Sequence, residues 1–218
     1  MIRKASDSWF RKRLMRLTSL EKRAVNSPRH AKRTVNVALD LLSSIELAPD
    51  ARCLELGCGQ GTLARLLVER FGARVTATDF DPAQVDLAQS KLRDLGETVS
   101  LQVIDARSLP YEDGRFDAVF SFGVMHHIAG GWRQVVGEVS RVLSPTGVFI
   151  FTDVYITHWL MWILRVFAPR ADLLDYAPLA QVLAEKKLEV TSQTREQRFA
   201  GLLSYGKTIA SKKRAGSD

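Results

Sequence analysis

The sequence contains little cysteine and no long hydrophobic run. Its two cysteines, Cys53 and Cys58, are too few and too close together to build a disulfide framework. No segment approaches the roughly 18 to 20 apolar residues of a membrane span, and the N-terminus lacks the apolar run of a signal peptide. These absences favour a protein of the reducing cytoplasm, either free or peripheral to a membrane.

The composition is that of one globular domain. The 218 residues are 46% hydrophobic and 25% charged, which allows a sizeable core and a modest extension. The net charge of +7 belongs to the ends of the chain. Residues 1–35 carry a net charge of +9, with eleven Lys or Arg against Asp7 and Glu21, and residues 195–218 carry +4, whereas residues 36–194 carry −6. We therefore expect a basic helical extension over residues 1–48 and one domain over residues 49–218.

The basic extension has the spacing of an amphipathic helix. Phe10, Leu14 and Leu17 fall on one helical face beside Trp9, and most of the basic residues lie elsewhere on the helix. Three interpretations stay open: the apolar stripe packs on the domain, the helix lies on an anionic membrane or another acidic partner, or it contacts nucleic acid. Nucleic acid is the least favoured, because aromatic side chains that stack on bases are scarce.

Beyond residue 49, short apolar strands alternate with helical stretches. This alternation predicts an α/β domain with a parallel sheet that helices cover on both faces. In such a sheet, cofactors bind at the carboxyl ends of the strands. After a lead-in helix that starts at Ser27-Pro28 and ends near residue 45, we expect strands at 52–56, 74–78, 99–104, 116–121, 148–152, 189–193 and 203–210, and helices at 61–70, 82–95, 132–143 and 177–187.

The first expected strand leads into a turn with three alternating glycines. The stretch from Cys53 to Thr62 reads Cys-Leu-Glu-Leu-Gly-Cys-Gly-Gln-Gly-Thr. Glycines let such a turn bring backbone N–H groups close to a ligand at the start of a helix. Thr62 stands where the dinucleotide pattern Gly-x-Gly-x-x-Gly needs its last glycine, which disfavours a dinucleotide. The candidate ligand-facing residues of this turn are Glu55, Gly57, Cys58, Gly59 and Gly61.

Acidic residues follow the next two strands. Asp79 comes twenty residues after Gly59, about the distance at which a carboxylate meets the two ribose hydroxyls of a nucleoside. Asp105 and Ala106 open the run Asp-Ala-Arg-Ser-Leu-Pro-Tyr-Glu-Asp-Gly-Arg-Phe-Asp, which ends at Asp117. Structural roles are the alternatives: Glu55 pins the turn, Asp79 caps the following helix, and Asp105 is a turn acid.

Together these motifs resemble the class I S-adenosylmethionine (SAM)-dependent methyltransferases. The glycine turn is similar to their (Asp/Glu)-x-Gly-x-Gly-x-Gly motif, and the Asp105 run is similar to Asp-Ala-x-x-Leu-Pro-(Phe/Tyr)-x-Asp-x-x-Phe-Asp. Leu143-Ser-Pro-Thr-Gly is similar to Leu-x-Pro-Gly-Gly, with Thr146 in place of the first glycine. The resemblance covers about residues 50–155. It implies a Rossmann-like, mostly parallel seven-stranded sheet of order 3-2-1-4-5-7-6, with strand 7 antiparallel and the chain complete.

The resemblance also implies roles for residues. SAM is the expected cofactor, S-adenosylhomocysteine its product, and no metal is needed. Asp79 would bind the ribose, Phe80 would flank the adenine, Asp105 would accept from the adenine amino group, and the backbone N–H of Ala106 would reach a ring nitrogen. The expected cofactor-binding residues are therefore Glu55, Gly57, Cys58, Gly59, Gly61, Asp79, Phe80, Asp105, Ala106 and Phe122.

Two adjacent histidines follow the fourth expected strand. His126 and His127 lie where the family places groups beside the transferred methyl group. An imidazole, with a pKa of about 6.5, is suited to take a proton from an amine, phenol or acidified carbon. One of the two is a candidate general base, and packing or loop hydrogen bonding is the alternative. The Asn-Pro-Pro-(Tyr/Phe) motif of amide methyltransferases is absent, which disfavours DNA adenine and protein glutamine as acceptors.

An apolar run after the fifth expected strand bears on the acceptor. Residues 157–169 include Trp159, Trp162 and Phe167 but are too short to span a bilayer. Within an expected substrate-facing helical segment, 155–188, the run is ordinary core, a roof over a hydrophobic pocket, or a contact with a membrane interface. The sequence thus predicts methyl transfer to a small, hydrophobic acceptor that resembles a quinone, polyketide or lipid. An RNA methyltransferase and a non-catalytic SAM-binding partner protein are the alternatives.

Overall fold

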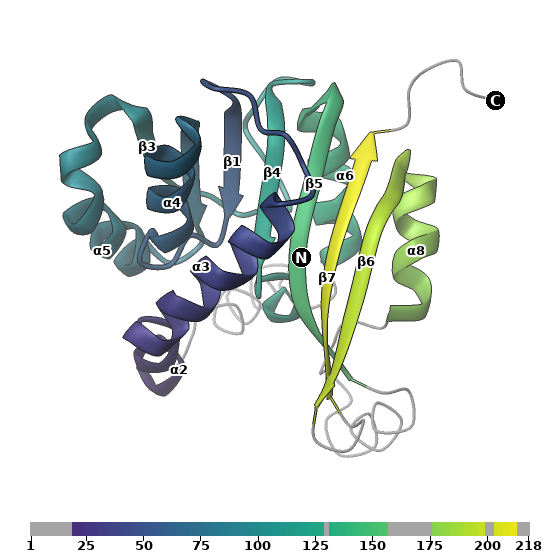
Figure 1. Ribbon diagram of the computed structural model, residues 1–218, viewed down its shortest axis with the longest axis horizontal. Helices are drawn as coiled ribbons and strands as arrows, with labels where there is room; N and C mark the ends of the chain where they lie inside the picture. Colours follow the sequence, from purple (N-terminus) through teal and green to yellow (C-terminus); the bar gives the residue numbers. More distant parts are fainter. Residues whose placement is uncertain (1–18, 129–130, 157–175, 199–202, 213–218) are drawn as a thin grey trace, which may run out of the picture.

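A computed structural model gives the arrangement of residues 19–128, 131–156, 176–198 and 203–212. Helices and strands alternate through most of this part of the chain (Figure 1). In chain order, the elements are α2 (Ser19–Val25), α3 (Pro28–Leu42), β1 (Arg52–Leu56), α4 (Thr62–Phe71), β2 (Arg74–Asp79), α5 (Pro82–Leu92), the 3-10 helix η1 (Arg93–Thr98), β3 (Val99–Val103), β4 (Phe116–Phe122), the 3-10 helix η2 (Met125–His127), α6 (Trp132–Val142), β5 (Leu143–Ile156), α8 (Tyr176–Glu185), β6 (Leu188–Arg198) and β7 (Leu203–Lys212).

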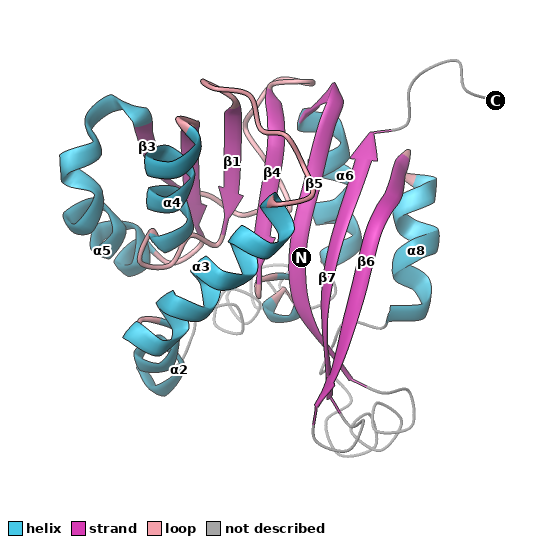
Figure 2. Ribbon diagram, viewed as in Figure 1, coloured by secondary structure: helices cyan, strands magenta, loops and turns pink. Residues whose placement is uncertain are grey.

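The strands form one seven-stranded sheet in the order β3-β2-β1-β4-β5-β7-β6 (Figure 2). β1 pairs parallel with β2 on one side and with β4 on the other, whereas β7 pairs antiparallel with both β5 and β6. The predicted strand order and the antiparallel last strand are confirmed. Because the order of the strands reverses direction between β1 and β4, the carboxyl ends of these two strands form a topological switch point, where α/β proteins bind ligands.

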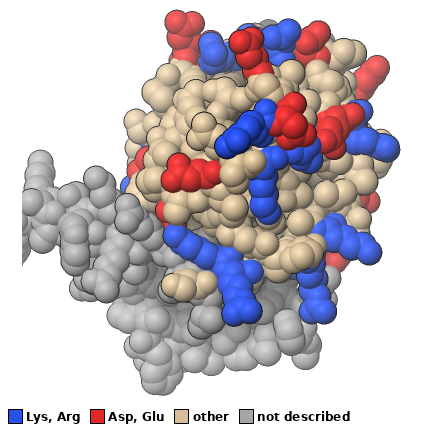
Figure 3. Space-filling view, turned by 90° about the vertical axis from the view of Figure 1, so that its left-hand side faces the viewer, with Lys and Arg blue, Asp and Glu red and all other residues tan. Residues whose placement is uncertain are grey.

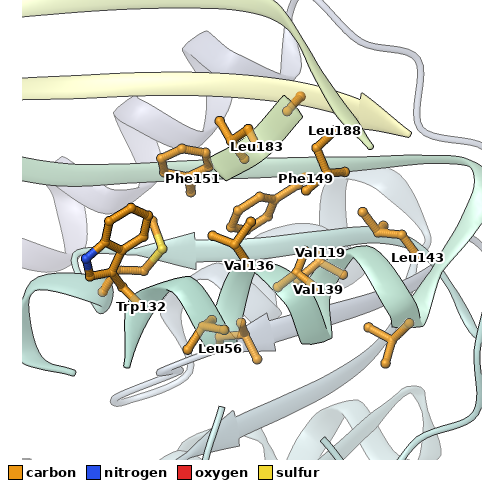
Figure 4. Close-up of a cluster of buried hydrophobic side chains, with 14 of the residues drawn as sticks. Leu56, Val119, Trp132, Val136, Val139, Leu143, Phe149, Phe151, Leu183 and Leu188 are labelled. Atoms are coloured by element: carbon orange, nitrogen blue, oxygen red, sulfur yellow. The ribbon is translucent and has the colours of Figure 1, made fainter. Parts of the chain in front are cut away.

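Helices cover both faces of the sheet, and each face has its own apolar core. On one face, α3, α4 and α5 pack against β1, β2 and β4 through small and medium-sized side chains such as Ala38, Leu67 and Ala88. On the other face, α6 and α8 pack against β4 and β5 (Figure 4). Figure 4 shows the second core as a layer that includes Trp132, Val136, Phe149, Phe151 and Leu183. The two layers fix the strands and hold their carboxyl ends in register.

The helix that precedes the sheet begins where its sequence predicts. Ser27 lies at the N-cap of α3, its Oγ accepts a hydrogen bond from the N–H of His30 at 3.2 Å, and Pro28 occupies the first turn. Farther along, Ala38, Leu41 and Leu42 are buried against the sheet. The helix is therefore anchored on the domain by its C-terminal half, while its first turns reach past the carboxyl ends of the strands (Figure 1).

The fifth strand is longer than the sequence predicts. A turn at 144–147 and a strand at 148–152 were expected, but β5 runs from Leu143 to Ile156. Its pairing with β4 slips across that stretch, since Leu143 faces Phe116 and the next pair is Val148 with Ala118. The expected turn is thus an irregularity inside a strand, and pairing with β7 through Ile156 extends the other end.

Two of the predicted segments lie outside the described residues. These are the amphipathic stretch that contains Phe10, Leu14 and Leu17, and the apolar run that contains Trp159, Trp162 and Phe167. Helix α8, at the end of the segment expected to face the substrate, buries Leu179, Val182 and Leu183 in the core. None of the helices in the described part of the chain combines the length and apolar character needed to cross a bilayer.

Candidate active site

A cavity opens at the carboxyl ends of β1, β2 and β4, at the switch point of the sheet. Its walls come from the glycine turn after β1, the end of β2, the segment after β3, the segment after β4, and the start of α3. Most of the residues predicted to bind a cofactor meet here. Those that line the cavity are Glu55, Gly57, Cys58, Gly59, Asp79, Phe80, Ala106 and Phe122, and His127 joins them from η2.

The glycine turn has the geometry that its sequence requires. Gly57 has φ +70°, and a Cβ at this position would lie 2.4 Å from Cγ2 of Val124, so a side chain is excluded by both backbone and space. Gly59 has φ +52°, and a Cβ there would have no neighbour within 4 Å. The backbone at Gly59 is therefore open to a ligand. Gly61 caps α4 with φ +81° and does not line the cavity.

Asp79 connects the end of β2 to the glycine turn. Its Oδ2 accepts a hydrogen bond from the N–H of Gly59 at 3.0 Å, and its Oδ1 accepts one from the N–H of Asp81 at 2.9 Å. Burial raises the pKa of Asp79, although these N–H groups oppose the shift. The cap of α5 is a different carboxylate, Asp81, which accepts from the N–H of Ala83. Asp79 is thus left to the turn and the cavity.

Glu55 is a buried acid with an oxygen that lacks a hydrogen-bond partner. It lies in β1, lines the cavity, and its Oε2 has no hydrogen-bond donor among the described residues. Burial, with a contribution from the nearby charge of Asp79, raises the pKa of Glu55 to about 8. A buried polar atom of this kind is expensive unless a ligand completes its bonding. The ammonium group of an amino-acid moiety is a chemically suitable partner.

Asp105 is placed less simply than the other acids. It does not line the cavity, although its neighbours Ile104 and Ala106 do. Its two carboxylate oxygens are bound by Arg107, whose Nη2 lies 2.6 Å from Oδ2 and whose Nε lies 3.0 Å from Oδ1. Burial opposes ionisation of Asp105, but the hydrogen bonds and charge of Arg107 outweigh it and hold its pKa below the ordinary value. The sequence motif did not reveal this competing partner.

The two histidines differ in their surroundings. Nδ1 of His126 lies 2.5 Å from Oδ1 of Asp153, and Oδ2 of Asp153 accepts from the N–H of Met125 at 2.9 Å. Asp153 lies in β5 and is fully buried. His127 lines the cavity, and its ring centroid is 3.9 Å from that of His126. When Nδ1 of His126 donates to Asp153, Nε2 keeps a lone pair that can accept a proton.

Helix α2 and the start of α3 form the outer wall of the cavity. Val25, His30 and Thr34 line it from this side. Two polar contacts hold the wall on α5: an ion pair between Lys22 and Asp81, and a hydrogen bond of 3.1 Å from Asn26 Nδ2 to Gln84 Oε1. We call α2 and the first turns of α3, residues 19–34, the cover.

The amide pair beneath the cover retains unused hydrogen-bonding atoms. Asn26 Oδ1 and Gln84 Nε2 are buried without a partner among the described residues. If both amides were flipped, the pair would still retain one acceptor and one donor. Gln84 lines the cavity beside Asp79. A vicinal diol, as in a ribose, presents matching donors and acceptors, so the polar groups of this cavity fit a nucleoside with an amino-acid tail.

Sequence reasoning missed Asp153, Asn26 and Gln84 as members of the site. Asp153 is a polar residue of β5 next to the end of β4. A polar residue at that strand end was the only sequence signal that could have indicated a place in the site. Asn26 is 58 residues from Gln84, so no local pattern connects them. Among the described residues, no three His, Cys, Asp or Glu side chains are grouped closely enough to hold a metal ion.

The chain is similar to known proteins over its central part. Residues 53–147 match a family model described as a methyltransferase domain. Over 112 residues, the chain is 40% identical to a demethylmenaquinone methyltransferase of Thermus thermophilus, an alignment that covers 50% of this chain and 49% of the relative. Over 120 residues, it is 28% identical to a sterol 4-C-methyltransferase of Caenorhabditis elegans, covering 54% and 35%. The chain thus spans about half or less of the curated relatives it matches.

The fold has close counterparts among solved structures. A geranyl diphosphate C-methyltransferase from Streptomyces coelicolor, crystallised with Mg²⁺, geranyl diphosphate and S-adenosylhomocysteine, superposes with a TM-score of 0.70. The sequences are 17% identical, and the match covers 84% of this chain and 81% of that one. The similarity in fold therefore extends beyond residues 53–147 to most of the chain. Residues 53–147 therefore match a methyltransferase domain, and the sheet around them has the fold of a solved C-methyltransferase.

Proposed function

We propose that this chain transfers the methyl group of SAM to a small, hydrophobic acceptor. The observation that carries the proposal is the cavity at the switch point, in which Glu55, Asp79 and the glycine turn share one space with His127. When bound, SAM supplies an electrophilic methyl group that leaves a sulfonium centre. The protein's own contribution is to align the acceptor with that group and to exclude water, which accelerates transfer by positioning and electrostatics.

The ribose, the ammonium group and the adenine of the cofactor each have a candidate partner. Asp79 and Gln84 would hold the ribose hydroxyls, and Oε2 of Glu55 would receive the ammonium group at the open turn of Gly59. Phe80 and Phe122 would flank the adenine, and Ala106 and Asp105 would contact its edge. The buried oxygen of Glu55 and the open backbone at Gly59 support this arrangement. Asp105 can serve only if Arg107 shares or releases it.

His126 is our candidate for the general base. The contact of 2.5 Å between its Nδ1 and Asp153 fixes the ring and leaves Nε2 as the acceptor of a proton. A buried carboxylate that orients a histidine also stabilises the charged ring that forms when the proton is taken. His127, which lines the cavity, is the candidate to contact the acceptor. This assignment requires an acceptor atom that carries an acidic proton.

A hydrophobic acceptor is supported by the cavity wall and by some of the relatives. Val25, Leu63, Ile104, Val124 and Ile128 contribute apolar lining. One relative is named for demethylmenaquinone and another for a sterol, both apolar molecules. Such acceptors partition into membranes, so a peripheral membrane contact of the basic extension is part of this proposal.

The acceptor class is tested by methyl transfer from tritiated SAM into a cell extract sorted into lipid, small-molecule, RNA and protein pools. We expect label in the lipid or apolar small-molecule pool. Label confined to RNA would favour an RNA methyltransferase that uses its basic ends. Binding of SAM without label in any pool would favour a non-catalytic SAM-binding partner protein.

The placement of adenine is tested separately by calorimetry. Asp105→Ala should weaken SAM binding by at least about 10-fold, because a charge-assisted hydrogen bond to the adenine amino group is lost. Arg107→Ala, which frees Asp105 from its ion pair, should bind SAM at least as well as the unchanged protein. Equal affinity in the Asp105 variant would contradict the adenine contact.

A further inference from the structure

Helix α3 presents three different faces. One face is buried on the sheet, and a second contributes His30 and Thr34 to the cavity. The third is exposed and basic, since residues spaced three and four apart lie on the same side of a helix. We call this third face the basic face; its residues are Arg29, Lys32, Arg33 and Asn36.

The basic face carries three cationic side chains. Within the described ranges, Arg29, Lys32 and Arg33 form no ion pair with a carboxylate. Glu196, an acid of the same groove, is held by Lys207, whose Nζ lies 3.0 Å from Oε1 of Glu196 and 3.0 Å from Oδ2 of Asp40. Three cations that have no carboxylate partner among the described residues, on one side of a helix, create a local positive potential that attracts anions.

The basic face borders a groove that reaches the sheet. Tyr205 and Lys207 of β7 and Glu196 of β6 form the opposite wall. The guanidinium of Arg33 lies over the ring of Tyr205, 4.4 Å from its centroid. That contact covers the aromatic surface of the groove, so Tyr205 is not available to stack on a nucleic-acid base.

Charge is unevenly distributed along the molecule. In the face shown in Figure 3, acidic and basic side chains mix over the upper part, whereas the charged side chains of the lower part are mostly basic. In Figure 1, the same lower level holds the cover and the carboxyl ends of the strands. On this face, the basic side chains therefore gather at the level of the cover and of the carboxyl ends of the parallel strands, where the cavity opens.

We infer that the basic face of α3 docks on an anionic lipid surface. Docking by this helix sets the neighbouring wall of the cavity, with His30 and Thr34, against the membrane from which an apolar acceptor would enter. The role of docking in acceptor entry rests on the proposed function, but binding to the anionic surface depends only on the charge of the basic face. Phospholipid headgroups are favoured over RNA, because the groove offers cations without an open stacking surface.

The test is cosedimentation of the full chain with vesicles of phosphatidylcholine alone or mixed with phosphatidylglycerol. We expect binding to the anionic vesicles that weakens as salt is raised. The triple variant Arg29→Gln, Lys32→Gln, Arg33→Gln should lower the partition coefficient on the order of 100-fold, because each basic residue contributes about fivefold at an anionic surface. Its matched control removes three exposed arginines elsewhere, Arg70→Gln, Arg74→Gln and Arg93→Gln, and should change partition little.

Several outcomes would overturn the inference. These are equal partition of the two triple variants, absence of binding to anionic vesicles, and binding to RNA that depends on the three residues while vesicle binding does not. Calorimetry with SAM shows that each variant is folded, since these residues do not line the cavity. If methyl transfer fails with every acceptor but vesicle binding still needs the three residues, the proposed function is wrong and the docking surface stands.

Discussion

The two walls of the cavity are built in different ways. The wall assigned to the cofactor comes from β1, β2, β3 and the turns after them, within residues 55–106, together with Phe122 at the end of β4. The wall assigned to the acceptor combines the cover with His127 of η2. The neighbouring His126 contacts Asp153, which lies in β5. The first wall is fixed by short-range backbone geometry and the second by contacts between distant segments. Local sequence motifs therefore predict the residues of the cofactor wall, whereas those of the acceptor wall depend on the tertiary fold.

The sharpest separation of the two walls comes from His126. His126→Asn should lower kcat by about 10²- to 10⁴-fold, because a general base contributes in that range, while SAM affinity stays the same. Asp153→Asn should lower kcat less and change the pH profile of the rate, since Asp153 is a positioning residue that acts through His126. Rates and SAM affinities of the two variants check this. If both variants also lose SAM affinity, the contact between His126 and Asp153 stabilises the fold and does not serve catalysis.

The cofactor wall should show its own dependence on pH through Glu55. Its pKa is raised to about 8, so the folded protein holds this proton more tightly than the unfolded chain does. The stabilisation is complete below the unfolded pKa and is lost as the pH rises through 8. Relative to Glu55→Gln, the free energy of unfolding should fall on the order of 3 kcal/mol between about pH 5 and pH 8. Chemical denaturation without SAM measures this, and Glu97→Gln, at an exposed site, should follow the unchanged protein.

Asp79 connects the turn to the ligand and should have a strong effect on binding alone. Asp79→Asn removes a charged acceptor and puts an N–H₂ group near the N–H of Gly59 or of Asp81. We expect SAM affinity to fall about 10- to 100-fold. Calorimetry measures the change, and Asp86→Asn on the exposed side of α5 is the matched control. An affinity within twofold of the original would remove Asp79 from the cofactor site.

The smallest expected effect tests whether the cover belongs to both walls. Asn26→Ala removes the hydrogen bond of 3.1 Å to Gln84 and should weaken SAM binding about 3- to 10-fold, because one neutral hydrogen bond is lost. Asn36→Ala, on the exposed face of α3, is its control. If the two variants bind SAM equally well, the cover serves the acceptor alone.

The sequence predicts the fold and the cofactor wall better than it predicts the acceptor wall. The alternation of strands and helices predicts the layered α/β domain, and the motif order, through the family resemblance, predicts the strand order. The length of β5 could not be predicted, because pairing with β7 and a slip against β4 override the turn signal at Pro145. The contact between His126 and Asp153 spans 27 residues and has no sequence period. Arg107 lies two residues after Asp105 in the sequence, but the ion pair between them requires one of several rotamers of the arginine.

The anchoring of α3 at one end has a consequence for exchange of small molecules. Its C-terminal half is held by buried Leu41 and Leu42 and by the ion pair of Asp40 with Lys207, whereas the cover is held on α5 by Lys22 and Asn26. Because the polar contacts of Lys22 and Asn26 join the cover to α5 in the described part of the chain, we expect opening of the cover to be local and to leave the sheet intact. The amides of the helix should therefore exchange with solvent deuterium in a gradient, fastest near Arg29 and slowest near Leu42.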